Sequence, residues 1–392
     1  MVGRGTIDNF DNNGKVAGIK VDNATIKYMN NQKDIISSAT DGIFLHAGTI
    51  DSFDNSGVIT GNQNGIRLEK NGGHVSGTIK TLNNTGSIIG INGYGINVVG
   101  SKDSFHTLNN QGYIYGKNSG IYVSGQWGIV GKISTIKNQG TIIGSQYGIH
   151  LVSFNGKLAS TIENIFNEGT ILGQISGIHL NAHNQYIDNH ILLQGPNALI
   201  AGGKAGIHNK GTIGVNNNNG SLVNNNTGNV IDLKNGATIA SLKQEKDALK
   251  YDESGTAILN EGTIKGNINL DKESKIIGAL HNKNTIGGNI SLNNKSYISS
   301  INNEKNIQGS IDLKEQSHIN SILNNGTIEK GISLDKSTIG TIVNTGIIGN
   351  EASPLATQDI TYGINNSGTI EKLINSSGDI NNPNTDKDIH IY

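Results

Sequence analysis

The sequence has 392 residues, with 54 glycines, 57 asparagines and 3 prolines, while aromatic residues make up 5% and charged residues 16%. This composition excludes a thick core of large side chains, and a net charge of -1 with periodic apolar residues argues against a disordered chain. Cysteine is absent and only two arginines occur, Arg4 and Arg67, which excludes disulfides and thiolate chemistry and argues against nucleic-acid binding.

The chain opens with MVGRGTIDNF, residues 1–10, which lacks the apolar segment of a signal peptide. No stretch of about 20 apolar residues follows that would form a transmembrane helix. Because the opening already resembles the repeat described next, we expect the sequence to be a piece of a longer protein.

A motif of the form Asn-x-Gly-Thr-Ile recurs along the whole chain. A spacing of 19 to 29 residues between copies indicates a stacked solenoid. Anchored on the first asparagine, the repeat has sixteen copies, at Asn12, Asn31, Asn55, Asn84, Asn110, Asn138, Asn167, Asn189, Asn209, Asn235, Asn260, Asn282, Asn303, Asn324, Asn344 and Asn366.

Apolar residues flank every anchor at two fixed offsets, two residues before it and four residues after it. Between anchors, apolar and polar residues alternate, as in GIHL, where Ile149 and Leu151 are expected inside and His150 outside. The pattern predicts an all-β fold, a right-handed parallel β-helix of about 16 coils. At about 4.8 Å per coil the rod would be about 75 Å long.

The motif itself is predicted to form a corner of each coil. Glycine follows the anchor by two residues in eleven of sixteen copies, and we expect it to supply a positive φ. The anchor asparagines are expected to stack as a ladder of hydrogen-bonded amides. Threonine and isoleucine then begin the next strand, one outward and one inward.

The chain is predicted to form one domain, residues 1–392, with longer coils in 1–256 and mostly minimal coils of 20 to 22 residues in 257–392. The extra residues of the long coils are expected to project as loops after the strand that contains Gly-Ile. Side chains on or near these loops are the candidate binding residues, by analogy with exposed aromatic residues at interfaces: Phe105, His106, Trp127, Phe154 and Tyr186.

Two sets of titratable residues recur in successive copies. His150, His179 and His208 are expected to form a solvated outward ladder with Arg67, Asn97 and Tyr122, because stacked neighbours do not converge on a metal. Asp271, Asp312 and Asp335 are expected to form a solvated charge ladder. We therefore predict no catalytic residues, no metal site and no cofactor, and a protein that is not an enzyme.

Three stretches, SGTAILNEGTIKGNINL, GIHNKGTIG and TYGINNSGTIEKLIN, resemble the passenger domain of bacterial autotransporters, which use type V secretion. The lysine, isoleucine and asparagine bias is similar to that of Campylobacter-type adhesion autotransporters. The resemblance implies a virulence-associated adhesin at the bacterial cell surface or outer membrane, or released from it. It also implies a C-terminal membrane barrel, which we expect to lie outside this sequence.

An adhesin of this kind would contact a host-cell receptor or glycan, or would self-associate with other passengers. Two alternatives remain open at this point. The first is a polysaccharide-degrading enzyme on the same fold, which would need carboxylates gathered in a groove. The second is a vacuolating-type toxin passenger.

Overall fold

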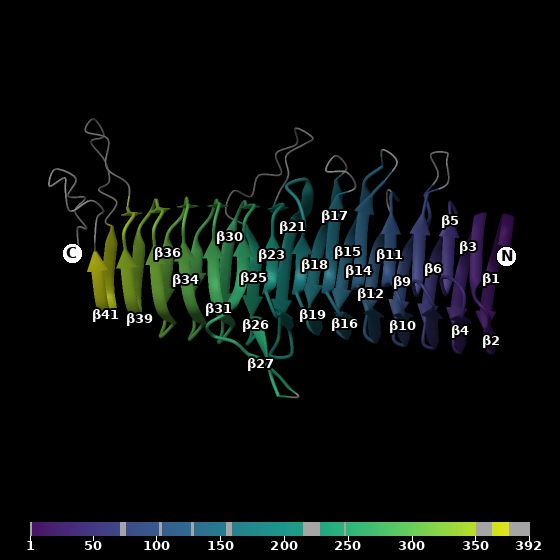
Figure 1. The fold of residues 1–392 in the computed structure, drawn as a ribbon, viewed down its shortest axis with the longest axis horizontal. Coiled ribbons are helices and arrows are strands. Elements are labelled where there is room, and N and C mark those ends of the chain that lie inside the picture. The colour runs from purple at the N-terminus through teal and green to yellow at the C-terminus, as the bar shows by residue number, and fades with distance from the viewer. Residues whose placement is uncertain are drawn as a thin grey trace.

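The structure is a computed structural model that describes residues 2–70, 76–101, 104–126, 129–153, 159–214, 228–246, 248–349 and 363–375. All of its regular elements are strands, and the 41 strands form one continuous hydrogen-bonded sheet. The strands wind around a rod, with β1 at one end and β41 at the other (Figure 1). The predicted all-β parallel β-helix is confirmed.

Each coil has three faces, which we name A, B and C in chain order. The strands of face A start the coil, and in the second half of the rod each of them is preceded by a two-residue strand. The strands on face A are β1 (Val2–Asn12), the second part of β3 (Ile19–Asn31), β6 (Thr49–Asn55), β9 (Thr78–Asn84), β12 (Phe105–Asn110), β15 (Gly131–Asn138), β18 (Ser160–Asn167), β21 (Gln185–Gln194), β24 (Thr212–Ile213), β25 (Asn229–Lys234), β29 (Thr263–Ile264), β30 (Asn267–Asp271), β32 (Thr285–Ile286), β33 (Ile290–Leu292), β35 (Asn306–Ile307), β36 (Ile311–Lys314), β38 (Thr327–Ile328) and β40 (Ile347–Ile348).

Faces B and C complete the coil. Face B contains β2 (Lys15–Val16), β4 (Asp34–Ser37), β7 (Val58–Gly61), β10 (Ser87–Gly90), β13 (Tyr113–Gly116), β16 (Thr141–Gly144), β19 (Thr170–Gly173), β22 (Leu199–Gly202) and β26 (Thr238–Glu245). Face C contains the first part of β3, β5 (Ile43–His46), β8 (Ile66–Glu69), β11 (Tyr94–Val99), β14 (Ser119–Gly125), β17 (Tyr147–Ser153), β20 (Ser176–Leu180), β23 (Ala205–Asn209) and β28 (Thr256–Asn260). Toward the C-terminus single strands run over more than one face: β31 (Lys275–Asn282), β34 (Tyr297–Asn303), β37 (His318–Asn324), β39 (Ile332–Asn344) and β41 (Ile364–Asn375).

Strand register gives the number of coils directly. On face A, fourteen residues stack one above the next: Phe10, Met29, Phe53, Leu82, Leu108, Ile136, Ile165, Ile191, Ile231, Ile268, Ile290, Ile311, Ile332 and Ile364.

Face B stacks fourteen residues as well, from Val16 to Ile370. So does face C, from Ile19 to Leu373. The described rod therefore has fourteen coils, not about sixteen, and is about 65 Å long.

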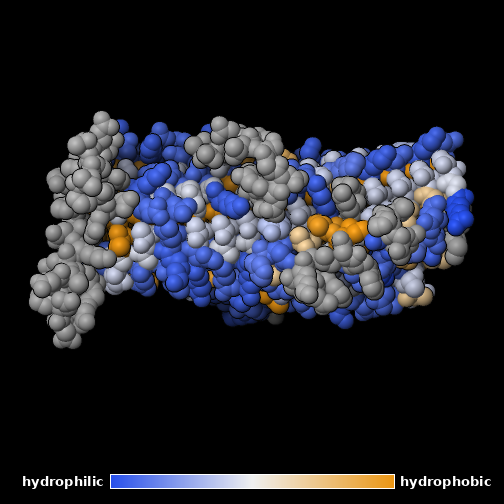
Figure 2. Space-filling view, turned by 90° about the horizontal axis from the view of Figure 1, so that it is seen from above, coloured by the Kyte–Doolittle hydropathy of each residue, from blue (hydrophilic) through white to orange (hydrophobic). Residues whose placement is uncertain are grey.

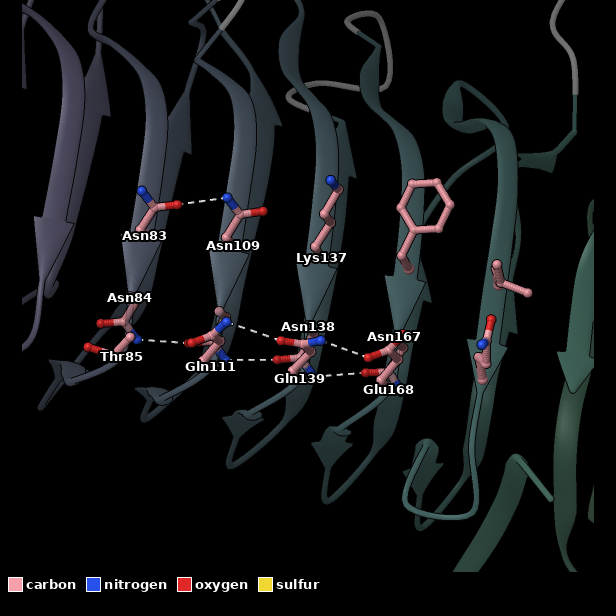
Figure 3. A pocket seen from close by; sticks show the side chains of 14 residues that line it. Asn83, Asn84, Thr85, Asn109, Gln111, Lys137, Asn138, Gln139, Asn167 and Glu168 are labelled. Carbon is pink, nitrogen blue, oxygen red and sulfur yellow. Dashed lines mark hydrogen bonds between the residues drawn. The ribbon is translucent and has the colours of Figure 1, made fainter. Parts of the chain in front are cut away.

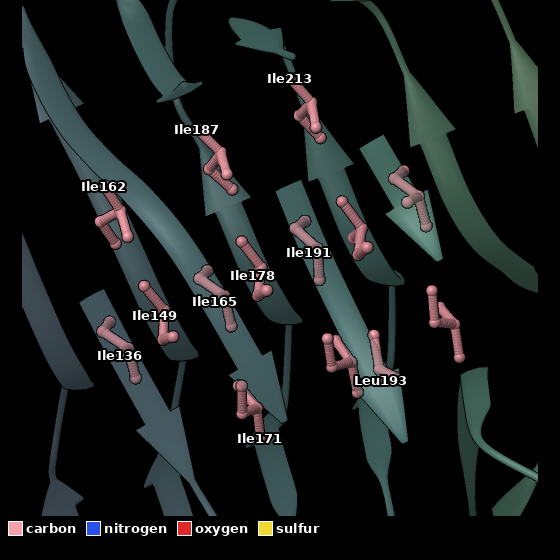
Figure 4. Packing of buried hydrophobic residues seen from close by; sticks show 14 of the residues in the cluster. Ile136, Ile149, Ile162, Ile165, Ile171, Ile178, Ile187, Ile191, Leu193 and Ile213 are labelled. Carbon is pink, nitrogen blue, oxygen red and sulfur yellow. The ribbon is translucent and has the colours of Figure 1, made fainter. Parts of the chain in front are cut away.

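Rows of isoleucine and leucine fill the interior of the rod. All 32 apolar residues that flank the predicted anchors lie in one core cluster or pack against it, so the predicted inward positions are confirmed. Neighbouring rows from the three faces meet along the axis, as Ile149, Ile165 and Ile171 show (Figure 4). Burial of these side chains, about 1.5 to 3 kcal/mol each, is the main stabilising contribution to the fold.

The predicted amide ladder exists, but as two separate ladders of seven asparagines. The first lies at the corner from face A to face B, with amide-to-amide hydrogen bonds of 2.6 to 2.8 Å. The second lies at the corner from face C to face A, with hydrogen bonds of 2.7 to 3.0 Å. The first ladder is Asn12, Asn31, Asn55, Asn84, Asn110, Asn138 and Asn167, and the second is Asn209, Asn260, Asn282, Asn303, Asn324, Asn344 and Asn375.

The change of corner between the ladders explains the wrong coil number. In the eighth coil Leu193 takes the place that Asn167 has in the seventh, and Asn209 then starts the second ladder. Asn189 is exposed and pairs with Asn164 instead, while Asn235 sits in a turn with φ of 57°. Asn366 stacks on Leu334, and Asn375 is the ladder member of the last coil.

The glycines of the motif have a different role from the one predicted. Gly112 and Gly140 are not among the residues with positive φ. A Cβ atom at Gly140 would lie 2.1 Å from the carbonyl oxygen of Gly112 in the coil before it. Glycine is required because the backbones of adjacent coils approach closely at this corner.

We expect Asn303→Ala to lower the free energy of unfolding by about 1 to 2 kcal/mol, because Asn303 joins its two ladder neighbours through hydrogen bonds of 2.8 Å on both sides. The neighbouring Asn302→Ala is the control, since its side chain points outward from the same strand. Urea denaturation of both variants tests the difference, and equal stabilities would contradict a stabilising ladder.

The outer surface is mostly hydrophilic on the face shown in Figure 2. The large hydrophobic side chains that are exposed among the described residues are few: Ile91, Leu249, Tyr251, Leu323 and Ile374. Two of them lie on β27 (Ala248–Tyr251), which forms an antiparallel hairpin with β26. Within the described ranges no helix is long and apolar enough to cross a membrane.

Candidate ligand-binding groove

A groove runs along the rod at the corner between faces A and B. The alternation of strand side chains creates it: each ladder asparagine, such as Asn110, points inward, while the residues on either side of it, Asn109 and Gln111, remain at the surface. The arrangement repeats over coils 4 to 7, counted from the N-terminus. It gives two parallel rows of outward side chains, one with Asn109 before the ladder asparagines and one with Gln111 after them, and the buried amide ladder lies between the rows. The pocket lined by these rows is the candidate functional site.

Hydrogen bonds between coils hold many of these side chains in place. They join the first members of the row that precedes the ladder asparagines, and most of the row that follows them. On face A, the Asn109 amide donates to the Asn83 side chain at 2.7 Å, and Asn83 donates to Asp54 at 2.8 Å. Beyond the corner, Gln111 donates to Gln139 at 3.2 Å and Gln139 donates to Glu168 at 2.8 Å (Figure 3). The polar walls are therefore ordered before any ligand arrives, which lowers the entropic cost of binding.

The face A row changes character in the middle of the groove. After Asn83 and Asn109 the stacked positions are Lys137, Phe166 and Leu192. The Phe166 ring is half-buried, and His190 contacts it edge-to-face at a centroid distance of 5.0 Å. The groove therefore combines amide side chains with one rigid aromatic ring and one apolar neighbour.

The groove ends where the asparagine ladder changes corner. Asn167 has no amide partner in the eighth coil, because Leu193 stacks on it, and its amide donates to the carbonyl oxygens of Gly169 and Leu199. Gln194, which follows Leu193, is the last side chain along this wall. The seam between the two halves of the rod thus closes one end of the groove.

The predicted candidate residues do not gather at this groove. Phe105 is fully buried between Ile79 and Ile133, so its prediction as a binding residue is wrong. His106 is exposed on β12, and Tyr186 is half-buried on β21 between Thr161 and Thr212, on a strand and not on a loop. Trp127 and Phe154 lie outside the described residues, and their role stays a prediction.

The four predicted excursions all begin at one corner of the coil. Glu69, Val99, Ser124 and Val152 precede the four excursions and are stacked in register at the end of face C. This is the corner from face C to face A, whereas the groove lies at the corner from face A to face B. The predicted excursions therefore begin on a different side of the rod from the groove.

The histidine column was predicted in register, and this is confirmed: His150, His179 and His208 stack on one another outside face C. The prediction that they are solvated is wrong for His179 and His208, which are 5% and 1% exposed, while His150 is half-buried. The Tyr147 ring covers two of them, at 4.2 Å from His150 and 4.8 Å from His179.

Burial lowers the pKa of His150 to about 3 and that of His179 to about 4, with neighbouring histidines adding to the effect. Burial also lowers the pKa of His208, although its hydrogen bond of 2.9 Å with Glu261 opposes this. One ring nitrogen in each of the three histidines is buried without a partner. These side chains are therefore neutral at pH 7, when they stabilise the stack by packing and not by charge.

Two carboxyl groups lie together on the outer surface of face A. A β-bulge between β18 and β21 places Asp188 and Asn189 opposite Glu163, and Glu163 forms an ion pair of 2.6 Å with Lys132. Burial, followed by the charge of Glu163, raises the pKa of Asp188 to about 6. In the described part of the chain no three His, Asp or Glu side chains converge where they could hold a metal ion.

The predicted aspartate ladder is only partly correct. Asp271 stacks on Lys234 and Asp335 stacks on Lys314, at the end of their strands. Asp312 belongs to another row, two residues earlier, where it stacks on Ser291. Lys314 therefore lies between Asp271 and Asp335 in the row.

No protein-family model matches this chain, and no curated protein or solved structure matches it either. The fold and the groove therefore rest on the sequence and the structure of this chain alone.

Proposed function

We propose that the protein is an attachment scaffold, an adhesin that displays the groove on a rigid rod for contact with a host-cell surface or with neighbouring cells. The observation that carries this proposal is the groove itself, where two rows of polar side chains are aligned along the rod around Phe166. A minimal coil needs none of these side chains, since the coils between Ile258 and Ile342 stack with a spacing of 20 to 22 residues.

The resemblance of the repeat to autotransporter passenger domains also supports this proposal. It implies that the rod stands at the bacterial cell surface or outer membrane, or is released from it. A surface location would expose the groove along its length to another cell. Trp127 and Phe154, which are predicted to lie on loops, would add further contacts.

We expect the double variant Lys137→Ala/Gln139→Ala to reduce attachment roughly tenfold, because both side chains line the groove and binding energy concentrates in a few central contacts. Beads coated with purified protein are counted on cultured epithelial cells. Lys305→Ala/Gln308→Ala, with the same residue types exposed on a minimal coil, is the matched control. Equal attachment by both variants and the wild type would remove the groove from the proposed function.

A second candidate function is a polysaccharide-degrading enzyme, favoured by the pair Glu163 and Asp188. A protonated carboxylic acid beside a carboxylate is the arrangement that glycosidic bond cleavage uses. Formation of new reducing ends from a polysaccharide at pH 5, abolished by Asp188→Asn, would support an enzyme. An intact polysaccharide after long incubation would leave attachment as the function.

A further inference from the structure

The groove presents a regular array of amide side chains to a ligand. Each of Asn83, Asn109, Gln111 and Gln139 carries one acceptor oxygen and an NH2 group with two donors. Only part of this capacity is used between coils, where each hydrogen bond joins one NH2 group to one oxygen. Such side chains match hydroxyl groups, which donate and accept at the same atom, better than they match groups of a single charge.

The charge of the groove argues in the same direction. Among its lining residues only Lys137 and Glu168 are charged, so the charges balance. A sulfated or otherwise polyanionic chain requires several cations in a row, because its binding energy comes from ion pairing. The groove has one cation, and the full sequence has a net charge of -1.

The shape of the groove selects a linear ligand. Its two walls repeat once per coil, at about 4.8 Å, along coils 4 to 7. Phe166 stands in one wall with its ring fixed by His190, next to Leu192. A flat apolar ring beside polar amides suits a sugar, whose ring has an apolar face and a rim of hydroxyl groups.

We propose that the groove binds an extended, uncharged glycan chain that lies along the rod axis, with one sugar ring packed on Phe166 and its hydroxyl groups bonded to the amide rows. This inference rests on the proposed attachment function, which it makes more specific by naming the ligand class. Neutral chains of hydroxyl-rich sugars are the chemistry that the rows recognise, whatever surface carries them.

The test is a calorimetric titration of the purified protein with neutral linear hexasaccharides of β-1,4-linked glucose and of β-1,4-linked N-acetylglucosamine, and with a heparin hexasaccharide. We expect one of the neutral chains to bind and heparin not to bind. Phe166→Ala should weaken binding at least tenfold, whereas Phe166→Tyr should retain it. Leu323→Ala is the matched control, since Leu323 also precedes a ladder asparagine and is 39% exposed, but on a minimal coil.

Circular dichroism of each variant establishes that it is folded, and the same proteins are used in the cell-attachment assay. Binding of heparin alone, or equal binding by the wild type and Phe166→Ala, would overturn the inference. No binding of any hexasaccharide while beads still attach to cells would overturn the glycan inference and leave the attachment function standing. Binding of a neutral chain without attachment to cells would support the glycan site and contradict the attachment function.

Discussion

Replacing Ile301 by aspartate will unfold a block of neighbouring coils. Ile301 is fully buried and stacks between Leu280 and Ile322 in the face C row of the core. A carboxylate there has no cation or donor to compensate its lost hydration, which costs several kcal/mol. Because each coil contacts only its neighbours, the loss spreads to the adjoining coils before it reaches the ends of the rod.

Thermal denaturation followed by circular dichroism measures this effect, and limited proteolysis locates the unfolded block. Asn302→Asp is the control, because it introduces the same carboxylate one residue later, where the side chain points outward. Two variants with the same melting temperature would contradict the inward assignment of Ile301. Cleavage confined to the chain around coil 11, with intact ends, would agree with unfolding that begins locally.

The inward positions could be predicted from the sequence because the alternation of apolar and polar residues depends on the strand alone. This holds even at anchors that were assigned wrongly. Ile187 and Leu193 flank Asn189 and are both fully buried, although Asn189 is no ladder member. The inward positions follow from the alternation of every second residue, so they are predicted correctly even where the corner is not.

The choice of corner could not be predicted, because the motif describes a turn and a coil has three turns. Asn167 and Asn260 occur in almost the same local sequence, FNEGTI and LNEGTI, yet occupy corners between different faces. Which corner a copy takes is set by the register against the coil before it. That register changes at the β-bulge of β21 and at Leu193, which no local pattern reveals.

The candidate site, too, could be predicted from the sequence only in part. Phe166 immediately precedes an anchor, where alternation places an outward side chain and neighbouring copies have asparagine or lysine. An aromatic residue at that position was a usable signal for the groove. Phe105, by contrast, occupies a position where the equivalent residues are Ile79 and Ile133, and that comparison predicts burial.

Burial of the histidine column depends on a contact that sequence separation hides. Tyr147 lies three residues before His150 on the same strand, but its ring also stacks on His179 of the next coil. Ser119 and Ser176, in the same row as Tyr147, are small and leave room for the ring. An outward position on a strand is therefore solvated only when no large side chain of its own coil or of an adjacent coil packs over it.

The same column makes the stability of the rod sensitive to acid. In the folded state burial depresses the pKa of His150 to about 3 and that of His179 to about 4, below the value near 6.5 of an unfolded histidine. Between these values the unfolded chain binds protons that the folded chain does not. The free energy of unfolding therefore falls as the pH drops below about 6.5, by about 1.4 kcal/mol per pH unit for each histidine.

Other titratable and charged groups change the size of this effect but not its sign. Lys204 and Lys210 disfavour a further positive charge near His179 and His208, and Glu261 favours one at His208. Asp188 acts in the opposite direction, since its pKa is raised to about 6 in the folded state. Between about pH 6 and pH 4 the free energy of unfolding gained through Asp188 offsets the amount lost through one of the two histidines, His150 or His179. The amount lost through the other histidine remains.

We therefore expect the melting temperature to fall steadily from pH 7 to pH 4, and the fall to be smaller in His179→Phe. Phenylalanine keeps an aromatic ring against Tyr147 and removes one titrating group from the buried column. His106→Phe is the control, because it makes the same substitution at an exposed position on β12, outside the buried column. If His179→Phe and the wild type lost stability in parallel on acidification, the acid sensitivity would have to come from groups outside the column. Glu261 would then be the first residue to replace, because its hydrogen bond with His208 lowers its pKa.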